Sequence, residues 1–308
     1  MIYSLRKPFK KYILLSRSVM QQATSNESSL QYCVNIVRQH DYENYLATLL
    51  MTKAFRTPAL VLRAFNVEVA RVQDQTTDPQ TAAMRLQFWQ DSVNAIYKNN
   101  NESTKVPAHP VIEELNKVCI SYKLPRRSLE RLITSRFNLL KMKYFNSIED
   151  VEKYTENTVS TIYYLLLCIA GVNNVHADHV ASHLGKAQGI ANILRSVHIS
   201  NYHKTIYLPM DVLMKHHLSQ ETVLRGNDSE NLRNVVFDIA SRANSHLEKA
   251  RSITVPKITT QIFLPAIAVD KYLIKLQEAN FNVFDKSLLH SSPTLPLSLY
   301  FKRILNKY

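Results

Sequence analysis

Residues 184–195 read LGKAQGIANILR, inside a longer segment, 176–199, whose composition predicts one continuous helix. Two of the chain's glycines, Gly185 and Gly189, lie in this stretch. The whole chain of 308 residues has only 4 glycines, where an average usage of about 7% would give roughly twenty. So few glycines cannot supply the positive-φ positions that hairpins and phosphate-binding loops require. Dinucleotide-binding folds, P-loop NTPases, α/β-hydrolases and β-sandwiches are therefore poor fits, and the composition predicts an all-α protein.

The rest of the chain, from about residue 30 to residue 308, is also predicted to be helical and to form one domain. Thr158–Ala170 is apolar nearly all round, so we expect it to lie at the centre. Pro58 is expected to begin a helix, and Asp78 is expected to cap one that starts at Pro79. The other predicted helices cover residues 32–39, 42–54, 60–74, 80–98, 111–122, 148–154, 232–253, 262–278 and 297–308, and one begins at Pro125.

The first 29 residues have the composition of a targeting sequence. They carry five basic residues, six serines and a single acid, Glu27. A basic, serine-rich segment that can form an amphipathic helix is typical of a mitochondrial transit peptide. We interpret residues 1–29 as a transit peptide that is removed, with a solvated basic tail as the alternative.

Charge and hydropathy limit the partners. The longest apolar run, Ile162–Val172, is far shorter than the ~20 residues that a spanning helix needs, so any membrane contact is expected to be peripheral. The net charge is +13, of which +9 lies outside residues 1–29, and it favours an anionic lipid surface, RNA or an acidic protein equally. Basic and aromatic residues are not interleaved as on RNA-binding surfaces, so no nucleic-acid partner is expected. Cys33, Cys119 and Cys168 match no ligand spacing and suit a reducing compartment.

Two groups of side chains have spacings compatible with a metal ion. The first consists of three histidines and an aspartate: His176, Asp178, His179 and His183. They can share one helix face, but a solvated helix start is the favoured interpretation. The second group is the D-x-x-x-D pair Asp74 and Asp78, which on one helix face would suit Mg²⁺. Pro79 disfavours the helical conformation at Asp78, so the cap is favoured and no metal or cofactor is expected.

Residues 184–195 resemble the second signature of the squalene/phytoene synthase family, a helix that reads roughly L-G-x-A-x-Q-x-x-N-I-L-R-D-x-x-x-D. Other blocks agree in the same order, at 60–74, 154–171, 206–211 and 264–284, so that the likeness covers residue 30 to about 285. The resemblance implies the isoprenoid-synthase fold, a bundle of antiparallel helices around a central cavity that side chains partly fill.

The resemblance also implies which residues line that cavity. In the family, two aspartate-rich motifs bind the Mg²⁺ that neutralises the substrate diphosphates. Here the first motif's paired aspartates correspond to Ala70 and Arg71, the second motif's to Ser196 and Ser200, and a family glycine to the bulky Tyr163. The vestigial cavity positions are Ala70, Arg71, Asp74, Ser160, Tyr163, Gly189, Asn192, Arg195, Ser196 and Ser200. We therefore expect no catalytic residues and no enzyme activity.

Several blocks look most like one branch of the family, whose members are assembly factors of mitochondrial respiratory complex I. They are residues 42–46, 62–68, 84–89, 176–179 and 250–251. This resemblance implies a mitochondrial protein, peripheral to the matrix side of the inner membrane, that binds complex I subunits or assembly intermediates. The open alternatives are an active Mg²⁺-dependent prenyl-diphosphate transferase, or a carrier of an anionic isoprenoid or lipid in which Arg71, Lys186 and Arg195 meet a phosphate.

Two segments are hypothesised to contact anionic lipid. The first is the basic stretch from Arg126 to Lys143, for which a solvated helix face is the alternative. The second is the C-terminal tail with Lys302, Arg303 and Lys307. For the tail, the alternative is that its apolar residues pack on the body of the protein: Leu297, Tyr300, Ile304 and Leu305.

Overall fold

The computed structural model describes residues 28–76, 78–98, 106–142, 144–203 and 205–308. Every regular element within these ranges is helical and none is a strand, which confirms the predicted all-α class. The predicted transit peptide lies outside the described residues except at Ser28 and Ser29. The α-helices are α2 (Ser29–His40), α3 (Tyr42–Leu49), α4 (Lys53–Arg71), α5 (Pro79–Lys98), α6 (Pro110–Tyr122), α7 (Arg126–Met142), α8 (Ile148–Thr155), α9 (Thr161–Ile169), α10 (Val175–His203), α11 (Met210–Lys215), α12 (Gln220–Leu224), α13 (Glu230–Ser252), α14 (Ala266–Glu278) and α15 (Leu295–Ile304).

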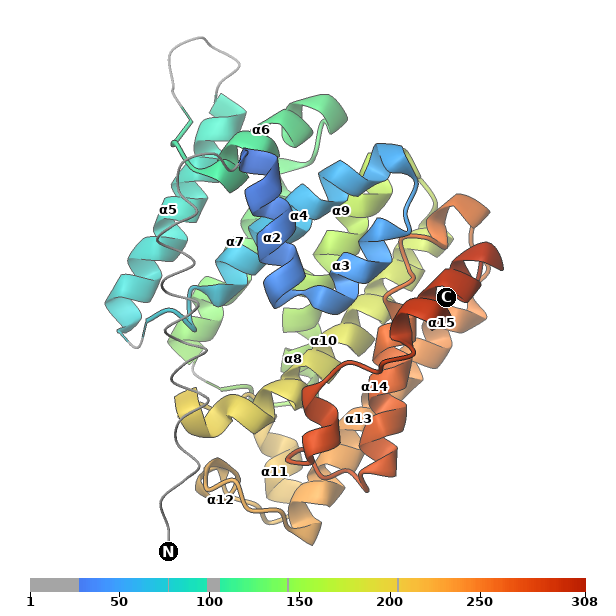
Figure 1. Cartoon of the computed structure of the whole chain (residues 1–308). Helices are drawn as coiled ribbons and strands as arrows, with labels where there is room; N and C mark the ends of the chain where they lie inside the picture. The colour runs from blue at the N-terminus through green and yellow to red at the C-terminus, as the bar shows by residue number, and fades with distance from the viewer. Residues whose placement is uncertain (1–27, 77, 99–105, 143, 204) are drawn as a thin grey trace, which may run out of the picture.

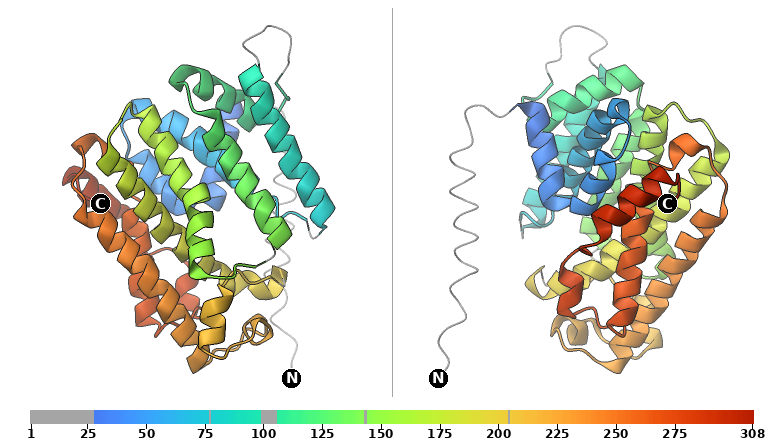
Figure 2. Two further views of the ribbon diagram at one scale, coloured as in Figure 1. Left: turned by 180° about the vertical axis from the view of Figure 1, so that it is seen from behind. Right: turned by 45° about the vertical axis from the view of Figure 1, so that its right-hand side comes forward.

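The long helix α10 runs through the middle of the molecule (Figure 1). It packs against α8 and α9 from the N-terminal half and against α13 and α14 from the C-terminal half. Two further views show α2 to α7 gathered on one side and α11 to α14 on the other, with α15 lying against α3 (Figure 2). Small and branched apolar residues such as Ala177, Leu184 and Ile190 are fully buried along α10. The helix that carries the signature residues is thus the centre of the core.

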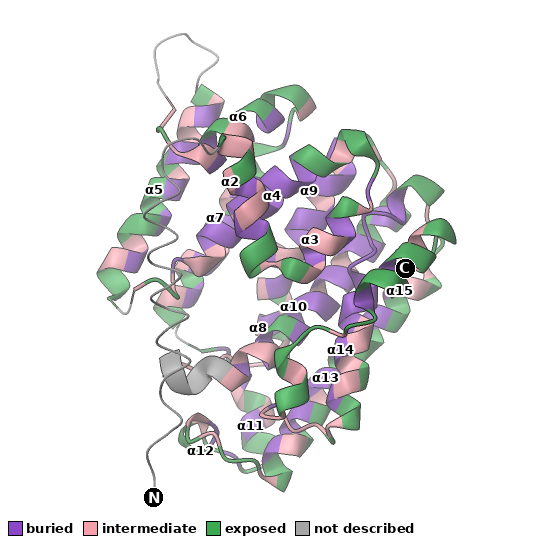
Figure 3. Ribbon diagram, viewed as in Figure 1, coloured by how far each residue is buried: buried purple, intermediate pink, exposed green. Residues whose placement is uncertain are grey.

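Burial follows this arrangement, with α4, α9 and α10 mostly buried and the outer helices half exposed (Figure 3). Ile162, Leu165 and Leu166 of α9 are almost fully buried, which confirms the central position predicted for Thr158–Ala170. No helix in the described part of the chain is long and apolar enough to cross a membrane.

The segment between α8 and α9 is a π-helix, Glu156–Ser160, so the two helices predicted at 148–154 and 158–170 form one continuous rod. Two glycines of α10 allow it to approach this rod closely. A Cβ atom added to Gly185 would lie 2.5 Å from the Ser160 Cα atom, and one added to Gly189 would lie 2.3 Å from the Thr155 Cγ2 atom. Neither contact leaves room for a methyl group.

Pro58 lies inside α4, which begins at Lys53, so the prediction that Pro58 starts a helix is wrong. A proline has no N–H to donate to the carbonyl four residues earlier, here that of Ala54. The Tyr122 hydroxyl lies 3.4 Å from the Ala54 carbonyl oxygen and donates to it instead. A tertiary contact therefore supplies a hydrogen bond that the proline cannot make within the helix.

Candidate functional site

A pocket of about 250 Å³ lies where α4, α9 and α10 meet the junction of α2 and α3. Its walls are mostly polar, with amide, carboxylate and guanidinium groups outnumbering apolar side chains. Five of the vestigial positions line it: Ala70, Arg71, Asp74, Tyr163 and Asn192. The pocket therefore brings together half of the positions that the resemblance assigns to the family's cavity.

The α4 side of the pocket ends in a turn. The Asp74 amide donates to the Arg71 carbonyl over 3.0 Å, directly after α4 ends at Arg71. Asp78 lies beyond this turn, where its carboxylate accepts the amides of Gln80 and Thr81 over 3.3 and 2.9 Å. The hydrogen bonds from Thr81 lower the pKa of Asp78. These bonds confirm the predicted cap, and Asp74 and Asp78 do not share a helix face.

The α10 side of the pocket is formed by Gln188 and Asn192, so in the described structure it presents no carboxylate. The Ser196 hydroxyl donates to the Ile193 carbonyl over 2.7 Å within the helix. Ser200 lies on the same helix, at a position whose side chain is outside the described part of the structure.

Arg195 is held by two neighbours. Its Nη1 atom lies 2.8 Å from the Glu43 carboxylate, and its guanidinium lies 4.4 Å from the ring centroid of Tyr272. The salt bridge and the ring together occupy this cation.

Ser160 and Gly189 do not line the pocket, in contrast to the expectation from the resemblance. Gly189 lies against Thr155, and the buried Ser160 hydroxyl donates to the Ser182 carbonyl over 3.1 Å. Because α10 approaches the π-helix so closely, no space remains between them for a ligand. These two positions are packing positions in this chain.

A chain of hydrogen bonds closes the inner end of the pocket. The Tyr163 hydroxyl donates to the Gln188 side chain over 2.6 Å, and Gln188 donates to the Asn44 side chain over 3.2 Å. Asn44 in turn donates to the Asp41 carboxylate over 2.7 Å. Burial raises the pKa of Asp41, against the opposing effect of Arg63. Tyr163 is fully buried, so its ring fills space at the position where the resemblance implies a glycine.

Arg63 of the pocket has a buried polar atom without a hydrogen-bond partner in the described part of the chain. Its side chain is buried, and its Nη1 atom lies 3.9 Å from the Asp41 carboxylate. Its Nε atom has no hydrogen-bond partner among the described residues. With Arg71 on the same helix, it gives the pocket two guanidinium groups.

The pocket fits Mg²⁺ poorly. Magnesium needs oxygen ligands in octahedral geometry, commonly one or two carboxylates together with substrate phosphates. Here two aspartates, Asp41 and Asp74, face two arginines, and the described α10 wall offers only amides. No group of three or more His, Cys, Asp or Glu residues able to hold a metal ion occurs in the described ranges. These residues do not fit a magnesium ion.

A second pocket of about 380 Å³ adjoins the first and shares His40, Asp41 and Asn192 with it. Its two lysines bind the C-terminal segment, since Lys271 donates to the Thr294 hydroxyl over 2.9 Å and Lys275 to the His290 carbonyl over 3.0 Å. Sites for hydrophobic ligands are usually lined by apolar side chains. Neither of these polar spaces has the lining that a prenyl chain requires.

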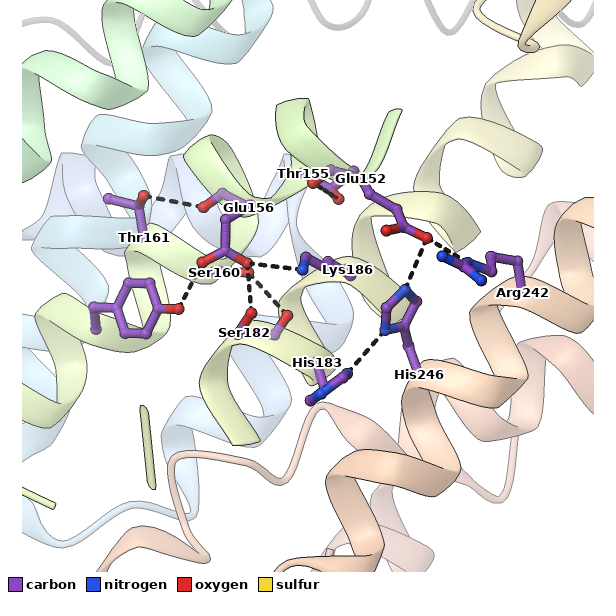
Figure 4. A network of polar contacts seen from close by, with 11 residues as sticks. Glu152, Thr155, Glu156, Ser160, Thr161, Ser182, His183, Lys186, Arg242 and His246 are labelled. Atoms are coloured by element: carbon purple, nitrogen blue, oxygen red, sulfur yellow. Dashed lines mark hydrogen bonds and ion pairs between the residues drawn. The ribbon is translucent and has the colours of Figure 1, made fainter. Parts of the chain in front are cut away.

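His183 belongs to a polar network away from the pocket (Figure 4). Its Nδ1 atom lies 2.9 Å from that of His246 on α13, and the His246 Nε2 atom lies 3.0 Å from the Glu152 carboxylate on α8. Arg242 also donates to Glu152. The partner of His183 is therefore 63 residues away in the sequence, not on its own helix. His176 and His179 are exposed.

Two other candidate cations are bound to protein groups. Lys186 lies 3.8 Å from the Glu156 carboxylate, which also accepts the Tyr164 and Ser182 hydroxyls (Figure 4). Arg136, in the middle of the basic stretch, is buried and donates to the Leu132 carbonyl and the Asn66 side chain over 2.7 Å each. Lys143, at the end of that stretch, lies outside the described residues. The stretch is thus not one continuous basic surface.

Comparison with known proteins agrees with the fold and the sequence pattern. A relative from Drosophila melanogaster, named NADH dehydrogenase (ubiquinone) complex I, assembly factor 6 homolog, is 41% identical over 291 residues, 93% of this chain and 87% of its own. The human protein named complex I, assembly factor 6 is 41% identical over 271 residues, 87% of this chain and 80% of its own.

Solved structures show the same fold at low identity. A dehydrosqualene synthase in complex with a ligand matches with a TM-score of 0.73 and 17% identity, over 90% of this chain and 95% of its own. The squalene synthase HpnC from Alicyclobacillus acidocaldarius matches with a TM-score of 0.70 and 16% identity, over 82% of this chain and 95% of its own. The sequence profile for squalene/phytoene synthase matches residues 37–297, and the chain belongs to the squalene/phytoene synthase family.

Proposed function

We propose that the protein is a non-catalytic assembly factor for mitochondrial respiratory complex I, NADH:ubiquinone oxidoreductase. In this role it binds an assembly intermediate or a subunit at the matrix face of the inner membrane. The observation that carries the proposal is the 41% identity, over about nine tenths of the chain, to proteins named complex I assembly factor 6.

The pocket supports the non-catalytic part of the proposal. A diphosphate leaving group requires divalent cations to neutralise its charge, and this pocket sets two arginines against two aspartates. Its volume of about 250 Å³ is below the roughly 300–1,000 Å³ typical of sites for drug-sized ligands. Tyr163 occupies its inner end. Both metal binding and prenyl-chain binding are therefore disfavoured.

Rescue of complex I in cells that lack the protein tests the proposal. We expect wild type and Asp74→Ala to restore complex I equally, because no metal ligand is lost. Leu194→Asp places a charge in the core and serves as a control that fails for lack of folded protein. An Asp74→Ala protein that is abundant and folded but does not restore complex I would contradict the non-catalytic role.

Turnover by the purified chain separates the proposal from an active transferase. With Mg²⁺ and farnesyl or geranylgeranyl diphosphate, we expect diphosphate release no faster than in buffer alone. Mg²⁺-dependent release that Asp74→Ala abolishes would instead establish a prenyl-diphosphate enzyme.

A carrier of an anionic isoprenoid or lipid is the second candidate, and Arg63 favours it. A buried guanidinium with an unbonded Nε atom is suited to a carboxylate or phosphate oxygen. Two of the cations hypothesised from the sequence to meet a phosphate are paired with carboxylates. Lys186 pairs with Glu156, and Arg195 pairs with Glu43. Native mass spectrometry of the intact chain tests this candidate: an added mass that Arg63→Gln removes would support a carrier, and the bare chain mass would support a scaffold.

A further inference from the structure

Helix α15 has two apolar faces, and only one of them packs on the protein. Leu295 and Leu299 are buried in a small cluster with Leu264 and Ile267. On the opposite side, a second set of apolar residues is exposed, each by more than half of its surface: Leu297, Tyr300, Phe301, Ile304 and Leu305. Their spacing of i, i+3, i+4, i+7 and i+8 forms one continuous stripe along the helix. We call this set the α15 stripe.

The α15 stripe overturns the alternative that the tail packs its apolar residues on the body. Leu295 and Leu299 already hold α15 against α3 and α14. Since these two residues point inward, a helix of this period must point the stripe outward. Figure 3 shows the exposed side of α15 at the surface, near the C-terminus. A monomer rarely exposes so many large apolar side chains together unless they contact something.

The charges around the stripe have one sign. The sequence contains no acid after Asp285, whereas α15 and the residues after it carry Lys302, Arg303 and Lys307. Arg303 donates to the Leu50 carbonyl over 3.1 Å, and exposed Arg56 donates to the adjacent Met51 carbonyl over 2.6 Å. A second arginine is thus fixed beside α15.

Two acids on the helices that α15 packs against are already paired with arginines. Glu43 on α3 pairs with Arg195 over 2.8 Å, and Asp270 on α14 pairs with Arg251 over 3.1 Å. The stripe and its rim therefore combine exposed apolar side chains with an excess of cations.

We propose that the α15 stripe docks the protein on an anionic phospholipid bilayer, with α15 lying in the plane of the membrane surface. Interfacial helices have this composition: an apolar face with aromatic residues, here Tyr300 and Phe301, and cations at the rim. A second copy of the chain is a poor occupant because it would bring the same cations against this face. The α15 stripe would provide the membrane contact of the proposed function. That the membrane is the inner mitochondrial membrane rests on the proposed function.

Flotation of the purified full chain with vesicles tests the proposal. We expect binding to phosphatidylcholine vesicles that contain phosphatidylglycerol, weak binding to pure phosphatidylcholine vesicles, and loss of binding at high salt. The double variant Phe301→Glu/Ile304→Glu is expected to reduce the bound fraction about tenfold or more, since two apolar anchors become charged. Lys302→Gln/Lys307→Gln is expected to weaken binding to the anionic vesicles only.

The matched control is Met84→Glu/Ile120→Glu. These two residues are at least as exposed as the stripe, but they lie on α5 and α6, across the molecule from α15 (Figure 1). The control adds the same charge and is expected to bind as wild type does.

Equal flotation of wild type and the stripe variant would overturn the proposal, as would wild type that binds no vesicle. If wild type ignores vesicles but the stripe variant fails to restore complex I, the stripe docks a protein instead. Vesicle binding with no restoration of complex I by wild type would leave this inference standing and remove the proposed function.

Discussion

Arg63 and Arg71 lie two turns apart on α4, and both line the first pocket. A divalent ion about 6 Å from one guanidinium is destabilised by about 5 kcal/mol at an effective dielectric constant of about 20. The two guanidinium groups therefore oppose the attraction that Asp41 and Asp74 would exert on magnesium. Two arginines against two aspartates leave the pocket without the excess of carboxylates that would favour a divalent cation.

The hydroxyl of Tyr163 is expected to contribute to stability as well as to fill the pocket. Tyr163→Phe keeps the ring but removes the donor to Gln188, whose buried side-chain oxygen then lacks this partner. The free energy of unfolding, measured with urea, should fall by about 1–3 kcal/mol. Tyr300→Phe is the control, because its hydroxyl is on an exposed residue, and it should change the free energy by less than about 0.5 kcal/mol. Equal values for the two variants would show that the chain of hydrogen bonds does not stabilise the fold.

Single residues were predictable from the sequence where their partners are local. Asp78 caps α5 through the amides of Gln80 and Thr81, so Asp78 next to Pro79 was a sufficient signal. His183 bonds to His246, and Arg136 turns inward to Asn66, and neither partner is close in the sequence. Periodicity places such residues on a face but does not say which helix covers that face.

At the scale of elements, the contact between α10 and the π-helix depends on glycine. A Cβ atom at Gly185 would lie 2.5 Å from two backbone atoms of Ser160, which cannot move as a flexible side chain does. Overpacking lowers the free energy of unfolding by about 1–3 kcal/mol. The higher helix propensity of alanine raises it by up to about 1 kcal/mol. We therefore expect Gly185→Ala to lower the free energy of unfolding by about 1–2 kcal/mol.

Thermal unfolding compared with His179→Ala checks this prediction. His179 is exposed on the same helix, so its replacement by alanine should leave the melting temperature nearly unchanged. A Gly185→Ala protein as stable as this control would mean that α10 and the π-helix can move apart without cost. The π-helix itself had no sequence signal, because residues 156–160 carry neither proline nor glycine.

The network that joins α8, α10 and α13 should make stability depend on pH. Burial, followed by the charges of His246 and Lys186, lowers the pKa of His183 from 6.5. The unfolded chain then binds this proton more readily than the folded chain, so the free energy of unfolding should fall as the pH drops below about 6.5. Burial opposes ionisation of Glu152, but hydrogen bonds from Arg242 and His246 lower its pKa overall. The stabilisation that ionised Glu152 contributes is therefore lost only at more acidic pH, below the ordinary pKa of 4.5.

Urea unfolding at several pH values tests this coupling. Between about pH 7.5 and about pH 5.5, His183→Gln should show a smaller loss of stability than wild type, because one titrating group is removed. His176→Gln changes an exposed histidine on the same helix and should keep the wild-type slope. If both variants keep that slope, the pair of His183 and His246 does not link stability to pH.

At the scale of the whole molecule, the all-α bundle could be predicted because helical periodicity and the lack of glycine both exclude other classes. The sequence could not predict which face of each amphipathic helix would pack on the rest of the protein. The tail has apolar residues on two faces, and its sequence did not say that Leu295 and Leu299 would pack while Leu297 and Phe301 would remain exposed. That choice depends on the shape of the surface formed by α3 and α14.

The start of α2 bears on where a transit peptide, if the first residues form one, would be cut. The Ser28 hydroxyl accepts the Gln31 amide over 3.2 Å, and the Ser29 hydroxyl donates to the Glu113 carboxylate over 2.6 Å, so both serines hold α2 in place. Removal of a serine cap costs about 1 kcal/mol. A transit peptide cut after residue 29 would remove both contacts, and we therefore expect the cut to fall before Ser28. Mass spectrometry of the mature protein from mitochondria measures its first residue. A mature chain that begins at residue 30 or later would contradict this expectation.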